Sequence, residues 1–275
     1  MATIRVPNEV PSPAQDSETL KQAIRGWGTD EKAIIRVLGQ RDQSQRRKIR
    51  ESFREIYGKD LIDVLSSELS GDFMKAVVSW TYDPAERDAR LVNKILLKVI
   101  VEISCTTSPN HLIAVRKAYC SLFDSSLEEH ILAKLLVTLA STFRYDKDRT
   151  DAEVATIEAA MLREAIVLYI LGTRSIYQLR ETFVAYKKNY GVTIDKLRSL
   201  LKVAIFCIDT PEKHFAKVVR DSIEGFGTDE DSLTRAIVTR AEIDLMKVRG
   251  EYYNTSMITG DISGDYKDFI ITLLG

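Results

Sequence analysis

The sequence has few of the residues that break or cross-link a chain. Its 275 residues include 13 glycines and 6 prolines, against roughly 19 and 14 at average usage. This scarcity of turn residues favours a helical protein. The three cysteines, Cys105, Cys120 and Cys207, form no CxxC pair and lie in apolar runs. We therefore expect free thiols in the core and a reducing compartment.

An excess of charge of one sign is also missing. The chain has 39 basic and 40 acidic side chains and a formal net charge of −1, which predicts no nucleic-acid partner. The basic run 46–48 is interpreted as solvated helix surface.

Long hydrophobic runs are absent as well. No run approaches the roughly 18 apolar residues of a membrane span, and residues 1–13 show no apolar signal region. Hydrophobic residues make up 45% of the chain, too many for a disordered one. We expect a cytoplasmic protein whose membrane contact is peripheral and reversible.

Sequence motifs of common enzymes are missing too. The chain contains no phosphate loop, HExxH, GxSxG or EF-hand pattern. His111, His130 and His214 lie in separate parts of the chain without metal-ligand spacing, so each is predicted to be structural or on the surface. We expect no catalytic residues and no enzyme.

What the chain does contain is a fourfold internal repeat. The apolar series at 33–38 returns at 99–103, 167–171 and 233–237, and Arg41 recurs as Arg174 and Arg240. Such periodicity indicates four copies of one structural unit. The predicted organisation is an amino-terminal tail at 1–13 and repeats at 14–83, 84–149, 150–209 and 210–275.

Each unit has helical spacing. In the first unit apolar residues follow i, i+3, i+4 steps, with breaks at 26–29, 39–42, 58–60 and 70–72. Thr29 and Asp30 suit a helix start, and Pro84 and Pro211 suit first helical positions. The pattern predicts an all-α fold with about five short helices per unit.

The middle units are too short to be full copies. Their helical segments follow one another without the connecting residues of the first unit, and at Ile166 and Val167 two counterparts of separate helices are adjacent. Since helices need connections, we infer that loop residues are missing from the middle units. Around Asn93 to Lys98 and at 166–167 we expect no strong calcium site.

Two matching glycine-threonine loops carry the functional signal. The sequence Gly26-Trp27-Gly28-Thr29 returns as Gly225-Phe226-Gly227-Thr228. Glycines allow a tight turn that leaves carbonyl oxygens accessible to a ligand. The plain alternative is a helix connection, in which glycine ends one helix and threonine caps the next.

Each loop is followed by a carboxylate at a matching place. Glu68 heads a Leu-Ser-Gly-Asp sequence in the first unit, and Asp261 heads Ile-Ser-Gly-Asp in the last. Carbonyl oxygens with one bidentate carboxylate form a hard, all-oxygen site suited to Ca²⁺. Trp27 and Phe226 occupy the loop tips, where a large aromatic side chain suits the interface between lipid and water.

The fourfold repeat with GxGT loops and a following acidic residue resembles the annexins, and loops kept in the first and fourth repeats resemble their plant branch. The resemblance implies a curved disc of four five-helix repeats. It also implies calcium held by carbonyls and one carboxylate in each outer repeat: Ile24, Gly26, Gly28 and Glu68, and Ile223, Gly225, Gly227 and Asp261.

The implied function is calcium-dependent binding to acidic phospholipid membranes, because a near-neutral chain has little attraction of its own for an anionic surface. Self-association on membranes is a further expectation. Two activities suggested for annexins are kept as alternatives. One is ion conductance. The other is a peroxidase activity linked to a first-repeat histidine, whose place is taken here by Gln40.

Overall fold

A computed structural model describes residues 1–26, 28–93, 97–130, 182, 185, 199–224, 227–251 and 260–275. Within these ranges the secondary structure is helical and contains no strand. The helices are α1 (Pro13–Ala23), α2 (Glu31–Leu38), α3 (Gln43–Tyr57), α4 (Leu61–Glu68), α5 (Gly71–Thr81), α6 (Pro84–Asn93), α7 (Leu97–Thr106), α8 (Pro109–Phe123), α12 (Ser199–Asp209), α13 (Pro211–Ile223), α14 (Glu230–Arg240), α15 (Leu245–Glu251) and α17 (Gly264–Leu274).

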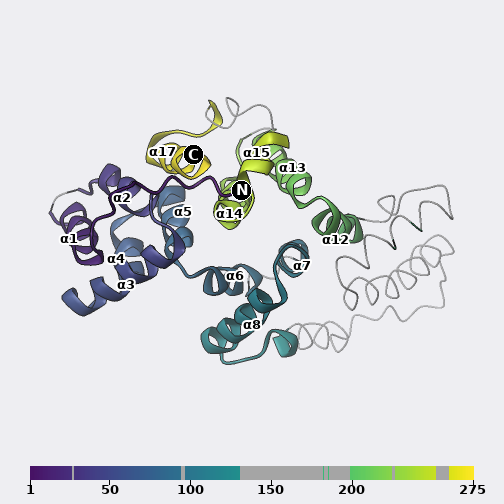
Figure 1. The fold of residues 1–275 in the computed structure, drawn as a ribbon, viewed down its shortest axis with the longest axis horizontal. Helices are drawn as coiled ribbons and strands as arrows, with labels where there is room; N and C mark the ends of the chain where they lie inside the picture. Colours follow the sequence, from purple (N-terminus) through teal and green to yellow (C-terminus); the bar gives the residue numbers. More distant parts are fainter. Residues whose placement is uncertain are drawn as a thin grey trace, which may run out of the picture. The chain divides into compact units, whose positions relative to one another are not determined.

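The chain divides into two compact units, one of Met1–Arg87 with Glu212–Gly275 and one of Asp88–Pro211. The first unit joins α1–α5 to α13, α14, α15 and α17, although these two groups of helices lie far apart in the sequence (Figure 1). The second contains α7, α8 and α12, and α7 packs against α12. The repeat boundaries given above stay predictions.

Local signals fix the helix ends in the first unit. Asp30 caps α2, since its carboxylate accepts from the Ala33 amide at 3.0 Å. Asp42 caps α3 in a capping box with Gln45. Gly58 ends α3 in the left-handed conformation. The predicted starts of α6 at Pro84 and of α13 at Pro211 are also confirmed.

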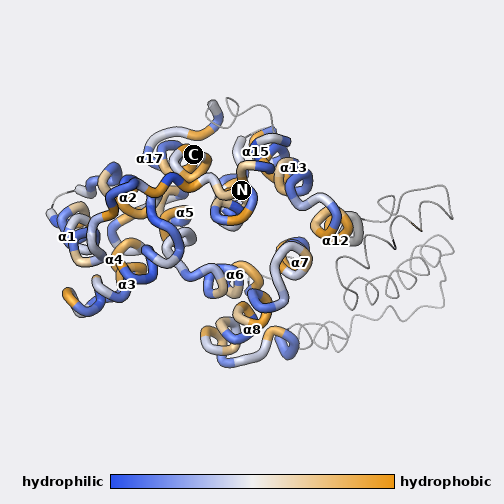
Figure 2. Tube along the Cα trace, viewed as in Figure 1, coloured by the Kyte–Doolittle hydropathy of each residue, from blue (hydrophilic) through white to orange (hydrophobic). Residues whose placement is uncertain are grey.

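The core of the first unit combines residues from both ends of the chain. Phe73 of α5 meets Phe269 of α17 edge-on, with ring centroids 6.1 Å apart. The buried Trp80 donates its indole N–H to the Leu38 carbonyl at 2.8 Å. Figure 2 shows hydrophobic and hydrophilic segments alternating along these helices, as expected of amphipathic helices around a shared core.

The prediction that the basic run 46–48 is solvated surface is wrong for Arg46. Its side chain is only 1% exposed, and its guanidinium lies 3.6 Å from the Trp80 ring centroid. It pairs with Glu242 at 3.0 Å and donates to the Arg41 carbonyl at 2.7 Å. Arg47 and Lys48 are exposed. The run therefore contributes one side chain to the core and two to the surface.

The cysteine prediction is correct in part. Cys207 is buried, Cys105 is partly buried and none of the three cysteines forms a disulfide. Cys120, however, is exposed on α8, because an apolar run does not by itself settle which face of its helix is buried. Burial raises the pKa of the Cys105 thiol to about 11.

The histidines lie in ordinary packing contacts. His111 contacts the buried Asp88 at 2.8 Å, His130 lies 2.8 Å from the Tyr119 hydroxyl, and His214 is buried with its ring against Phe215. Along the described part of the chain, no helix combines the length and apolar character that crossing a membrane requires.

Candidate metal-binding loops

The first loop connects α1 to α2 and is closed at its base. Ile24 follows the end of α1, and its amide donates to the Leu20 carbonyl at 3.2 Å. The Asp30 amide then donates back to the Ala23 carbonyl at 2.8 Å. This bond brings the two ends of the loop together, and Arg25, Gly26, Gly28 and Thr29 lie between the helices.

The two glycines of this loop adopt conformations that disfavour other residues. Gly26 has φ +115° and Gly28 has φ +91°. No atom lies within 4 Å of the place where a Cβ would stand at either position. The requirement for glycine is therefore one of backbone conformation, and open space surrounds both residues.

The described residues of the loop between α13 and α14 repeat this closure. Ile223 is the last residue of α13, and the Asp229 amide donates to the Ser222 carbonyl at 2.7 Å. Gly227 has φ +89°. Asp229 has φ −90° and ψ 83°, almost identical to Asp30 with φ −89° and ψ 83°. The described residues of the two loops thus share the closing hydrogen bond, a left-handed glycine before the threonine and the conformation of the capping aspartate.

A carboxylate-bearing residue lies beside each loop. Glu68 is the exposed last residue of α4, and its backbone carbonyl accepts from the Thr29 hydroxyl at 3.5 Å, the outer limit of hydrogen bonding. The carbonyl of the exposed Asp261 accepts from Thr228 at 3.3 Å. In both repeats the threonine therefore joins the loop to the predicted acidic residue.

Some of the predicted residues lie outside the described ranges. These are Trp27, Gly225 and Phe226, and also the connections at 94–96 and 166–167 of the middle repeats. The described residues include no group of three or more histidine, cysteine, aspartate or glutamate side chains that could hold a metal ion. A site made of carbonyl oxygens and one carboxylate would not produce such a group.

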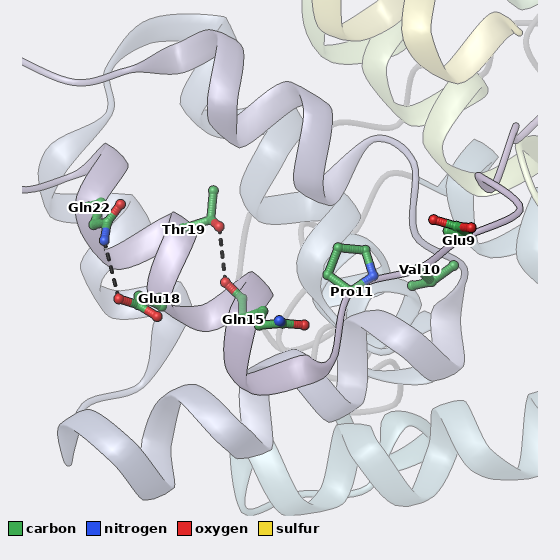
Figure 3. A pocket seen from close by; sticks show the side chains of 7 residues that line it. All are labelled: Glu9, Val10, Pro11, Gln15, Glu18, Thr19 and Gln22. Atoms are coloured by element: carbon green, nitrogen blue, oxygen red, sulfur yellow. Dashed lines mark hydrogen bonds between the residues drawn. The ribbon is translucent and has the colours of Figure 1, made fainter.

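Two hollows in the first unit differ in their relation to these loops. One of about 300 Å³ is bordered by Asp261 of the last repeat and by Ser70 and Asp72 of the first. The other, of about 630 Å³, lies between the amino-terminal tail and α1 (Figure 3) and contains none of the predicted ligands. There Gln22 donates to Glu18 and Thr19 donates to the Gln15 carbonyl.

The paired loops and the helical repeats place the chain in a known class. A family model described as Annexin matches residues 15–80, 151–197 and 214–273. The chain therefore belongs to the annexin family, and the predicted all-α fold is confirmed by solved annexin structures.

Its relatives include plant annexins, as the loop pattern predicted. The chain is 86% identical to Annexin D3 of Arabidopsis thaliana, covering 100% of this chain and 99% of that protein. It is 44% identical to the annexin-like protein RJ4 of Fragaria ananassa, with 95% of each covered. The first alignment spans 318 positions against 275 residues here. That relative therefore has residues without a counterpart in this chain, and their place in the middle units stays a prediction.

The solved structures give the same result. A structure of annexin III matches with a TM-score of 0.83 and 30% identity, covering 100% of this chain and 97% of that one. A calcium-bound structure of annexin (Sm)1 matches with a TM-score of 0.77 and 26% identity, covering 100% and 93%.

The loop threonines are the residues whose contacts sequence reasoning missed. Thr29 and Thr228 are recognisable in the GxGT pattern and suit helix starts. Their hydrogen bonds, however, reach residues 39 and 33 positions away. Only the repeated pairing of a GxGT loop with a later acidic residue hints at this contact.

Proposed function

We propose that this chain binds acidic phospholipid membranes in a calcium-dependent manner through the loops at 24–28 and 223–227. The observation that carries the proposal is the duplicated geometry of the described residues. In each outer repeat a closed loop with left-handed glycine is joined through threonine to an exposed acidic residue. The calcium-bound annexin relative supports the choice of ion.

The donor set fits Ca²⁺. Backbone carbonyls of Ile24, Gly26 and Gly28 with the Glu68 carboxylate would form the first site, and Ile223, Gly225, Gly227 and Asp261 the second. These are hard oxygen donors, which Ca²⁺ prefers over nitrogen or sulfur. The open space around Gly26, Gly28 and Gly227 leaves the loops accessible from solvent.

The charge of the chain explains why an ion is needed. A net charge of −1 gives no general attraction to an anionic leaflet. Calcium, when bound, supplies positive charge and coordination positions that lipid phosphate can fill. The exposed carboxylates of Glu68 and Asp261 hold that charge at the protein surface. Arg25 is exposed in the first loop, while Glu224 takes its place in the fourth, so a phosphate-binding role for this position does not extend to both.

The loop aromatics add an apolar contribution. Trp27 and Phe226 would enter the interfacial region, where fully burying a large side chain contributes about 1.5–3 kcal/mol and shallow insertion less. For localisation, we propose that the protein is cytoplasmic and attaches reversibly to the membrane surface.

Cosedimentation with lipid vesicles tests the proposal. With calcium, the chain should sediment with vesicles containing phosphatidylserine and should be released by EGTA. Vesicles of phosphatidylcholine alone serve as the control for acidic lipid. Binding that persists undiminished in EGTA would show that calcium does not mediate attachment.

Binding rather than catalysis is proposed as the activity. Gln40 stands where the peroxidase alternative needs a histidine, and its backbone carbonyl accepts from Arg41 at 3.2 Å in the turn between α2 and α3. The chain should therefore neither bind haem stoichiometrically nor turn over peroxide. A haem titration and a peroxidase assay test this prediction. Stoichiometric haem binding with peroxide turnover would contradict it.

A further inference from the structure

We infer that Thr29 and Thr228 are positioning residues, which hold the acidic residue of each outer repeat beside its loop. This inference rests on the proposed calcium-binding function. Its basis is that each threonine hydroxyl donates to the backbone carbonyl of the same residue whose carboxylate is the proposed ligand.

The threonine is one of three consecutive attachments in the first loop. Gly28 gives the turn its left-handed conformation, Thr29 reaches the end of α4, and the Asp30 amide closes the loop on Ala23. The Asp30 carboxylate caps α2 at the same place. Because its neighbour Asp30 is attached at both backbone and side chain, Thr29 starts from a well-defined position.

The acidic residue is fixed from its other side. Glu68 ends α4, so its carbonyl lacks an intrahelical partner. The next residue, Leu69, is only 7% exposed and its amide donates to the Leu65 carbonyl at 3.0 Å. The buried leucine and the threonine hydroxyl thus constrain the backbone of Glu68, while its side chain remains exposed to solvent.

The last repeat reproduces this arrangement independently. The residue after Asp261 is Ile262, which is 5% exposed, and Thr228 donates to the Asp261 carbonyl at 3.3 Å. Glutamate in one repeat and aspartate in the other keep the same backbone contact. The contact therefore depends on the backbone position of the acidic residue and does not depend on the length of its side chain.

The contact should raise calcium affinity because it orders the site before the ion binds. A calcium site assembled from two separate segments must order both, and a tether present before binding removes part of that cost. Loss of one neutral hydrogen bond of this kind should weaken calcium affinity by roughly 3- to 10-fold.

The experiment isolates one site at a time. In an Asp261→Asn background, calcium binding at the first loop is measured by calorimetry for Thr29, Thr29→Val and Thr29→Ser. Thermal unfolding in EGTA is recorded for each variant. The control is Thr19→Val, because the Thr19 hydroxyl also donates to a backbone carbonyl, that of Gln15 at 3.0 Å, but within α1.

The expected result is weaker calcium binding in Thr29→Val, recovery in Thr29→Ser, and little change in Thr19→Val. Unfolding temperatures in EGTA should be similar for all variants, since the contact joins exposed segments. Equal calcium affinities of Thr29→Val and the parent, or a Thr29→Ser variant as weak as Thr29→Val, would overturn the inference while leaving the calcium site intact. No calcium binding by the unmodified chain would instead refute the proposed function, and the inference with it.

Discussion

Removing the Glu242 carboxylate should destabilise the first unit, because it leaves the buried Arg46 guanidinium without its charged partner. Arg46 is 1% exposed at its side chain and reaches Glu242 through two contacts of 3.0 and 3.2 Å. Desolvation by burial lowers the pKa of Arg46, and Glu242 opposes that effect. The carboxylate is thus the main compensation for a buried guanidinium.

The magnitude follows from this geometry. Breaking a fully buried ion pair from one side costs about 3–5 kcal/mol. The Glu242 side chain is 21% exposed, so water can partly replace it, and we expect about 2–3 kcal/mol for Glu242→Ala. With a urea dependence of about 2–3 kcal/mol per M, the unfolding midpoint should fall by about 1 M.

Tryptophan fluorescence provides the assay. The chain has two tryptophans, so a Trp27→Phe background leaves the buried Trp80, whose ring lies against Arg46, as the reporter. Glu55→Ala is the control, because Glu55 is exposed on α3 and should change stability by less than about 0.5 kcal/mol. A midpoint shift for Glu242→Ala no larger than that of Glu55→Ala would refute the reasoning.

Two further predictions concern the first loop and the thiols. Gly28→Ala should strain the loop by about 1–2 kcal/mol at φ +91° without a steric clash, and should weaken calcium binding in calorimetry; unchanged affinity would contradict this. In native thiol labelling Cys120 should react first, because Cys207 is buried and burial raises the pKa of Cys105 to about 11. Faster labelling of Cys207 than of Cys120 would show that this part of the fold is wrong.

Local sequence signals predicted several helix starts and one turn well. Asp30, Pro84 and Pro211 mark helix starts because capping and the fixed φ of proline act within a few residues. Gly26 and Gly28 mark a turn because only glycine adopts their φ values easily. These effects are local, so one sequence suffices to find them.

Contacts between distant segments were not predictable in this way. Arg46 and Glu242 are 196 positions apart, and nothing near either residue identifies its partner. The recurring arginine shows the same limit: Arg41 pairs with Asp16 of α1, whereas Arg240 pairs with Asp244, four residues ahead. The repeat predicts the position of the arginine, while tertiary packing selects its partner.

The paired acidic residues provide the decisive test of calcium-mediated attachment. Glu68→Gln with Asp261→Asn removes both proposed carboxylate ligands. Asp63→Asn with Asp268→Asn is the matched control, since Asp63 and Asp268 are exposed carboxylates on α4 and α17. In calcium-dependent cosedimentation with phosphatidylserine vesicles, the first variant should lose binding and the control should retain it. Equal binding by both variants would contradict the assignment of these loops as the membrane site.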